Sequence, residues 1–207
     1  MENPNLGRPL VLGHEGTGIV THVGRNVTHL KEGDHAIVTW VPRTPVRGRP
    51  DVPPSGVTFR EEPVHGNVYT WGEDVLVSGE YVVQISKDYP TDVTCLIGCA
   101  VLTGAGAVLN TAKVRPGDSV AVFGVGGVGL CAITIDSRLF VTHQRQYRGS
   151  LGATYPDKDF QMFLRLYQEG KFPLDKLVTQ RYQLKDINEA CDALKSGNIL
   201  GRAIIEY

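Results

Sequence analysis

The sequence predicts an α/β fold in two parts, and two observations lead to this prediction. Short apolar segments punctuated by glycines, such as 18–24 and 35–41, are typical of a β-rich domain. Farther along the chain, a valine-rich segment at 119–123 runs directly into a glycine-rich turn. This pattern is typical of a buried parallel strand that leads into a helix. We therefore expect a β-rich domain together with a strand–turn–helix unit of a parallel sheet.

The first half of the chain is expected to consist of short strands. The segments 18–24 and 35–41 are apolar enough for strands, and a turn at 31–34 separates them. The segment 42–63 contains six prolines and several arginines, which favours an irregular loop. Strands are expected to resume farther on, at 75–77 and 80–85.

Helical patterns dominate the second half outside its central segment. The segment 92–108 is rich in small residues and predicts a helix with Cys95 and Cys99 near one face. Two amphipathic helices are expected at 159–169 and 186–196, and a glycine follows each of them. Further strands are expected at 139–142 and 202–207.

The central segment contains glycines with the G-x-G-x-x-G spacing of a dinucleotide-binding turn, namely Gly124, Gly126 and Gly129. The first glycine allows a tight turn, the second lets the backbone approach a pyrophosphate, and the third lets helix and strand pack closely. Free N–H groups at the start of the helix would then face the phosphate. A turn of this kind can also be purely structural, but the preceding strand pattern favours a nucleotide site. Gly127 completes the set of candidate cofactor-binding glycines.

Composition and charge exclude several other function classes. The formal net charge is −1 and the pI is about 6.6, so neither nucleic acid nor an anionic membrane is an expected partner. No segment approaches the roughly 20 apolar residues of a membrane span, so none is expected. Residues 1–4 lack the basic and apolar regions of a signal peptide. The four cysteines have no disulfide-framework spacing, which favours a reducing, cytoplasmic location.

Several segments, taken in chain order, resemble the zinc-dependent medium-chain alcohol dehydrogenase family. Gly13–Val20 resembles the GHE-x-x-G-x-V signature of that family. Cys95–Cys99 resembles the helix that delivers a catalytic zinc ligand, and Gly124–Gly129 matches the cofactor turn. The segment 147–202 resembles the C-terminal part of the family. The order is right throughout, and the resemblance covers nearly the whole chain.

The resemblance implies a reversible hydride transfer between an alcohol or aldehyde and NAD or NADP. A zinc ion would polarise the substrate oxygen. The same resemblance assigns catalytic and metal-binding roles to His14, Glu15 and Cys99, with Glu15 as an alternative ligand or a group beside the metal. The residues implied to contact the cofactor are Gly124, Gly126, Gly127, Gly129 and, through a phosphate, Arg202.

The residues alone also allow plainer interpretations. An isolated histidine such as His14 is usually a core or solvated side chain, and Cys95 with Cys99 would ordinarily be packed apolar residues. Arg202 could be a solvated charge. The remaining cysteines and histidines have no ligand-like spacing, so core, surface or structural roles are expected for Cys131, Cys191, His22, His29, His35, His65 and His143.

The chain departs from the family pattern in its metal ligands. The family takes a cysteine ligand from a segment upstream of the GHE signature, but no cysteine precedes Cys95 here. A catalytic zinc normally has three protein ligands, so Glu15 would have to supply the third. The loop 42–63 contains no cysteine, so the four-cysteine structural zinc lobe of many relatives is not expected.

A second departure concerns the cofactor domain. Only about twenty residues separate Gly129 from Gly149, whereas a doubly wound sheet needs several further β–α units. No acidic residue lies about 20 positions after the turn, where one would hold the ribose. We infer an internal deletion near residues 133–137 that removes most of a Rossmann sheet.

These observations predict a GroES-like β-barrel catalytic domain over 1–110, with 150–207 packing back onto it, and a truncated Rossmann-type cofactor-binding domain over 111–149. The expected function is that of a zinc-dependent alcohol dehydrogenase, acting on a small alcohol or aldehyde as a homo-oligomer or paired with an intact relative. Two alternatives remain open. One is a non-catalytic remnant or interaction module derived from such an enzyme. The other is a zinc-free reductase of the same superfamily, which the His14, Glu15 and Cys99 set disfavours.

Overall fold

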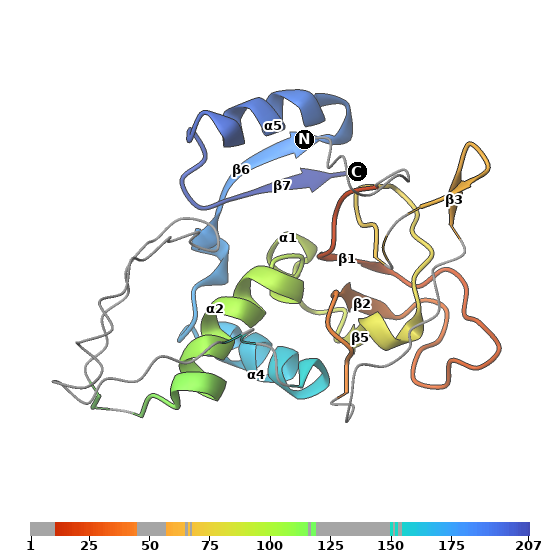
Figure 1. The fold of residues 1–207 in the computed structure, drawn as a ribbon. Helices are drawn as coiled ribbons and strands as arrows, with labels where there is room; N and C mark the ends of the chain where they lie inside the picture. The colour runs from red at the N-terminus through yellow and green to blue at the C-terminus, as the bar shows by residue number, and fades with distance from the viewer. Residues whose placement is uncertain are drawn as a thin grey trace, which may run out of the picture.

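A computed structural model describes residues 11–44, 57–64, 66, 68–115, 117–118, 150, 152 and 155–207. Its N-terminal part contains a three-stranded antiparallel sheet in the order β1-β2-β5 (Figure 1). The strands are β1 (Gly16–Ile19), β2 (His35–Val38) and β5 (Val82–Ile85). In the register Gly16 lies opposite Val38, and His35 lies opposite Ile85. The central strand β2 is almost fully buried, which makes it the natural anchor of the sheet.

The expected strands differ from the observed ones at several points. The strand expected at 18–24 begins earlier and ends at Ile19, after which the backbone forms turns. The segment 75–77 is not a strand, and Leu76 is 71% exposed, because an apolar run gains little from extended structure without a neighbouring strand. Part of the proline-rich loop forms a short hairpin, β3 (Thr58–Phe59) with β4 (Glu62–Pro63), whose turn residues have positive φ.

A nearly continuous helical segment follows the sheet, as the sequence predicts for 92–108. It consists of α1 (Thr91–Thr94), a π-helical turn η2 (Ile97–Val101), α2 (Leu102–Gly106) and a second π-helical turn η3 (Ala107–Ala112). The segment ends at Lys113, which adopts a left-handed conformation with φ of 54°. π-Helical turns inside α-helices are often found at functional sites.

The core lies between this helical segment, the sheet and α4 (Pro156–Gln168). Phe160, Phe163 and Leu164 on α4 are fully buried, together with Ile37 from β2 and Ile97 from the π-helical turn. Figure 1 shows α4 beside α2, so the C-terminal part of the chain returns to pack on the N-terminal part. The amphipathic helix expected at 159–169 is thus confirmed, and it begins slightly earlier, with Pro156 in its first turn.

The C-terminal end forms a separate β–α–β unit. Strand β6 (Val178–Gln183) pairs in parallel with β7 (Arg202–Glu206), and α5 (Ile187–Lys195) connects them. In Figure 1 this unit lies above α1. The expected helix at 186–196 and strand at 202–207 are confirmed, whereas β6 was not expected because four of its six residues are polar or charged. Short 3-10 turns occupy Gly79–Tyr81, Leu174–Leu177 and Leu184–Asp186.

The α/β composition of the prediction is confirmed, but the barrel is not. Within the described residues the strands form one three-stranded and two two-stranded sheets, and these do not close into a barrel. The few residues in each strand leave too little sheet to curl on itself. The truncated Rossmann-type domain, including the strands expected at 120–123 and 139–142, lies outside the described residues, so the limits of the expected domains remain predictions.

One expectation from composition was wrong. The helical segment Thr91–Ala112 spans 22 residues with a mean hydropathy of 1.8, long and apolar enough to cross a membrane by these two measures alone. Small residues interrupt the apolar runs of this segment, so a search for uninterrupted apolar runs does not detect its high mean hydropathy. The same test is passed by core helices of soluble proteins, and 44% of the window is buried inside this structure. The segment is therefore only a weak indication of a membrane span.

Replacing Phe163 with alanine should destabilise the fold strongly. Its side chain is fully buried and meets Phe172 edge to face, with ring centroids 6.2 Å apart. We expect a loss of about 3–5 kcal/mol in the free energy of unfolding, measured by urea denaturation. The control Leu76→Ala removes an apolar side chain that is 71% exposed and should change stability by no more than about 0.5 kcal/mol. Equal losses in both variants would contradict this assignment of the core.

Candidate functional site

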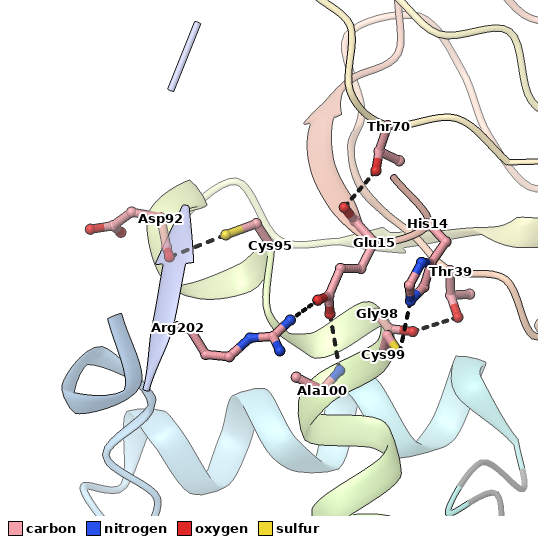
Figure 2. A network of polar contacts seen from close by, with 10 residues as sticks. All are labelled: His14, Glu15, Thr39, Thr70, Asp92, Cys95, Gly98, Cys99, Ala100 and Arg202. Carbon is pink, nitrogen blue, oxygen red and sulfur yellow. Dashed lines mark hydrogen bonds and ion pairs between the residues drawn. The ribbon is translucent and has the colours of Figure 1, made fainter. Parts of the chain in front are cut away.

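The structure brings His14 and Cys99 together across 85 positions of sequence. The Nε2 atom of His14 lies 3.2 Å from the Sγ atom of Cys99 (Figure 2). His14 lies two residues before the start of β1, and Cys99 lies on the π-helical turn that follows α1. The imidazole is exposed and the thiol is partly buried, so the pair sits at the surface with one side open to solvent.

The loop that carries His14 has a conformation that requires glycine. Gly13 has φ of +91°, and a Cβ there would lie 2.5 Å from the indole ring of Trp71. The same loop is tied to the neighbouring segment by backbone hydrogen bonds from Thr70 N–H to Gly13 and from Trp71 N–H to Leu12. The first residue of the GHE signature therefore fixes the direction in which His14 leaves the backbone.

Glu15 lies beside the pair, but its carboxylate is turned toward other partners. Its Oε2 atom accepts a hydrogen bond of 3.0 Å from the Ala100 N–H, and its Oε1 atom forms an ion pair with Arg202 of β7 (Figure 2). The Glu15 carbonyl accepts a further hydrogen bond of 2.8 Å from the Thr70 hydroxyl. The two side chains of the ion pair are 17% and 27% exposed, so solvent screens the interaction only partly.

The surroundings of Cys99 act on its ionisation in opposite directions. Burial raises the pKa of the Cys99 thiol above its usual value, and the negative charge of Glu15 raises that pKa further. Hydrogen bonds with the side chains of Trp40 and Thr103 lower it, as does the positive charge of Arg202. A cation beside this thiol would favour its ionised form.

Cys95 is placed differently although it lies one helical turn away. Its thiol donates a hydrogen bond of 3.3 Å to the Asp92 carbonyl and lies apart from the His14–Cys99 pair (Figure 2). Burial, followed by the charges of Glu15 and Asp92, raises the pKa of Cys95 to about 12. Cys95 is thus packed against its own helical segment, which is the plainer of the two interpretations that its sequence allows.

The two donors that meet are compatible with zinc, but they do not form a complete ligand set. Zn–N and Zn–S bonds measure about 2.0–2.1 and 2.3 Å, which places two ligands of one tetrahedral ion about 3.5 Å apart. The His14–Cys99 distance of 3.2 Å is close to that value. Within the described part of the chain, no group of three or more His, Cys, Asp or Glu side chains could hold a metal ion. The third expected ligand, Glu15, has both carboxylate oxygens engaged elsewhere.

The remaining sequence-predicted residues divide into two groups. Arg202 is brought to the site, where its guanidinium pairs with Glu15. The cofactor glycines Gly124, Gly126, Gly127 and Gly129 lie outside the described residues, as do Cys131, His65 and His143. Of the other histidines, His29 has a structural role, since its Nε2 atom lies 3.1 Å from the Gly79 carbonyl oxygen.

Sequence reasoning missed several residues that hold the site together. Thr39 and Thr70 donate hydrogen bonds to backbone carbonyls next to the two candidate ligands, and Trp40 contacts Cys99. Thr39 and Trp40 lie in an apolar segment that predicts only a strand. No spacing in the sequence indicates these contacts, because they depend on how the sheet meets the helical segment.

Comparisons with known proteins show what the chain is similar to. The family model for the alcohol dehydrogenase GroES-like domain matches residues 1–87. Alcohol dehydrogenase B from Mycobacterium tuberculosis is 38% identical over 153 residues, which cover 63% of this chain and 40% of the relative. S-(hydroxymethyl)glutathione dehydrogenase from Escherichia coli is 37% identical over 157 residues, covering 64% of this chain and 42% of the relative. The chain thus spans about two fifths of the length of these relatives.

Solved structures with a similar fold come from the same group of proteins. Benzyl alcohol dehydrogenase from Acinetobacter calcoaceticus superposes with a TM-score of 0.62 at 22% identity, covering 95% of this chain and 83% of the other. An alcohol dehydrogenase zinc-binding domain protein from Burkholderia ambifaria gives a TM-score of 0.70 at 20% identity, covering 96% and 84%. At these identities the likeness concerns the fold alone. Over the part of the sequence that these comparisons cover, the chain is therefore similar to alcohol dehydrogenases.

Proposed function

We propose that this chain carries the metal-binding half of a zinc-dependent alcohol dehydrogenase, which transfers a hydride reversibly between a small alcohol or aldehyde and NAD or NADP. The observation that supports the proposal best is the meeting of His14 Nε2 and Cys99 Sγ at 3.2 Å, from segments 85 positions apart. An imidazole and a thiol are the ligand types that zinc prefers. Two curated relatives are named as alcohol or hydroxymethylglutathione dehydrogenases, which supports the same class of reaction.

Each of the described residues would have its own role in such a site. His14 and Cys99 would hold the metal, which when bound supplies a positive charge that polarises an alcohol or carbonyl oxygen. Glu15 places a negative charge next to the pair, and Arg202 with the Ala100 N–H holds that carboxylate in place. The exposed side of His14 leaves room for a substrate oxygen to approach.

Cofactor binding rests on the sequence and on the position of Arg202. Gly124, Gly126, Gly127 and Gly129 have the spacing of a pyrophosphate-binding turn. Arg202 lies at the candidate site on β7, where its guanidinium could serve a phosphate. Because that guanidinium is paired with Glu15 in this structure, a phosphate would compete with the carboxylate for it.

A specific observation also favours the second candidate function, an interaction module that derives from such an enzyme. A groove of about 1470 Å³ runs between β1 and the β6–β7–α5 unit. Many of the exposed large apolar side chains line this groove, namely Leu12, Ile19, Trp71, Val75, Leu76, Leu194 and Tyr207. Exposed apolar surface of this kind commonly marks an interface. The occupant would be a second copy of the chain or an intact relative, in the reducing cytoplasm that the cysteine pattern favours.

Cobalt(II) titration of the purified chain tests the metal-binding half of the proposal. Cobalt(II) occupies zinc sites, and a thiolate ligand gives it a sulfur-to-metal charge-transfer band. We expect the band in the parent chain and its loss in Cys99→Ser. The control Cys95→Ser alters a thiol that hydrogen-bonds to the Asp92 carbonyl and should keep the band. Loss of the band in Cys95→Ser but not in Cys99→Ser would overturn the ligand assignment.

NADH titration tests the cofactor half. Trp40 and Trp71 are 42% and 39% exposed and lie close to the candidate site, so bound nicotinamide should quench their fluorescence. We expect saturable binding that weakens about tenfold or more in Arg202→Ala, since hydrogen bonds to charged groups contribute about 1.5–3 kcal/mol. The control Arg165→Ala removes an exposed arginine on α4 and should leave binding unchanged. Absence of binding up to millimolar NADH in a folded sample would reject the enzyme and leave the interaction module.

A further inference from the structure

A single buried hydroxyl joins the end of β2 to the turn that carries Cys99. Thr39 follows β2 directly and is fully buried, with 0% of its surface exposed. Its Oγ1 atom donates a hydrogen bond of 2.6 Å to the Gly98 carbonyl and accepts one of 3.2 Å from the Val41 N–H (Figure 2). The hydroxyl therefore acts as donor and acceptor at once, in a place without access to water.

The sheet and the helical segment approach each other very closely at this point. A Cβ at Gly98 would collide with the Val38 carbonyl and would lie 3.3 Å from the Cβ of Glu15. Gly98 belongs to the π-helical turn Ile97–Val101, in which the Val101 N–H reaches back to the Leu96 carbonyl at 3.1 Å. The Thr39 hydroxyl thus holds this rare kind of helical turn from outside the helical segment.

The residues next in sequence to this contact both belong to the candidate site. Cys99 follows Gly98, and Trp40, which follows Thr39, lies beside the Cys99 side chain. On the other side of the thiol lies His14, 3.2 Å away. The Thr39–Gly98 hydrogen bond thus links the segment that carries Trp40 to the turn that carries Cys99.

We propose that Thr39 is a positioning residue for the candidate metal site, whose hydroxyl holds the π-helical turn so that Cys99 Sγ faces His14 Nε2. The inference rests on the proposed function, in which these two atoms are ligands. Thr39 hydrogen-bonds to neither of them and acts through the Gly98 carbonyl. Removal of the hydroxyl breaks the hydrogen bond to the Gly98 carbonyl and takes the acceptor away from the Val41 N–H, so the turn loses this link to the end of β2.

Two variants separate the hydroxyl from the packing of the side chain. Thr39→Val keeps the shape of the side chain and removes the hydroxyl, whereas Thr39→Ser keeps the hydroxyl and removes the methyl group. With cobalt(II) as the probe, we expect Thr39→Val to bind about 10- to 100-fold more weakly, as for other groups that support metal ligands. Thr39→Ser should stay within about threefold of the parent. Circular dichroism should show the same folded state in all three proteins.

A second readout does not depend on metal binding. The rate at which iodoacetamide alkylates Cys99 in the metal-free chain reports how the turn presents this partly buried thiol. We expect a rate about threefold or more higher in Thr39→Val than in the parent or in Thr39→Ser. Cys95, resolved by mass spectrometry, is the internal control and should react at an unchanged rate, because its own hydrogen bond lies on α1.

The two readouts keep the inference and the proposed function apart. If the parent binds no cobalt(II) through Cys99, the proposed function fails, and the alkylation rates still decide the role of Thr39. An unchanged Cys99 rate in a folded Thr39→Val protein would overturn the inference. Equal effects of Thr39→Val and Thr39→Ser would overturn it too, since packing would then account for both.

Discussion

The arrangement of the site depends on one carboxylate, that of Glu15. Its two oxygens bind Arg202 of β7 and the Ala100 N–H on the π-helical turn. The backbone carbonyl of Glu15 accepts a hydrogen bond from the Thr70 hydroxyl. A largely buried carboxylate is costly unless it is paired and hydrogen-bonded, and here both conditions are met. Segments 85 and 187 positions away from Glu15 are thereby held against the loop that carries His14.

This arrangement has a consequence for the chemistry. The partners that hold Glu15 in place are the reason why it does not turn toward His14 and Cys99. Within the described residues the pair is therefore a two-donor site with a fixed negative charge beside it. The negative charge of a neighbouring carboxylate favours a bound cation whether or not the carboxylate becomes a ligand. The Arg202 guanidinium pairs with the Oε1 atom of Glu15 and so helps to keep this carboxylate in place.

The sequence predicted the residues of the site better than their arrangement. The GHE signature and the cysteine pattern led to His14 and Cys99 by resemblance, and the structure brings the two together. No periodicity could have shown it, because the contact joins a loop before a strand to a turn in a helix. Arg202 was expected at a cofactor phosphate and is found on Glu15, since charge pairing between distant segments leaves no trace in local sequence.

In the fold, too, features set by local sequence were predicted and features that depend on distant segments were not. The helices expected at 92–108, 159–169 and 186–196 are found at 91–112, 156–168 and 187–195, because amphipathic or apolar helical patterns are local. Strands failed where they depend on neighbours. The apolar segment 75–77 has no partner strand, and the polar β6 exists because β7 pairs with it.

The most direct test of this account is X-ray absorption spectroscopy at the zinc edge, on the chain loaded with one equivalent of zinc. We expect a sulfur neighbour at about 2.3 Å and nitrogen or oxygen neighbours at about 2.0–2.1 Å, including the outer-shell pattern of an imidazole. The sulfur shell should disappear in Cys99→Ser. A zinc environment made only of oxygen and nitrogen in the parent chain would contradict the claim that His14 and Cys99 form a metal-binding pair.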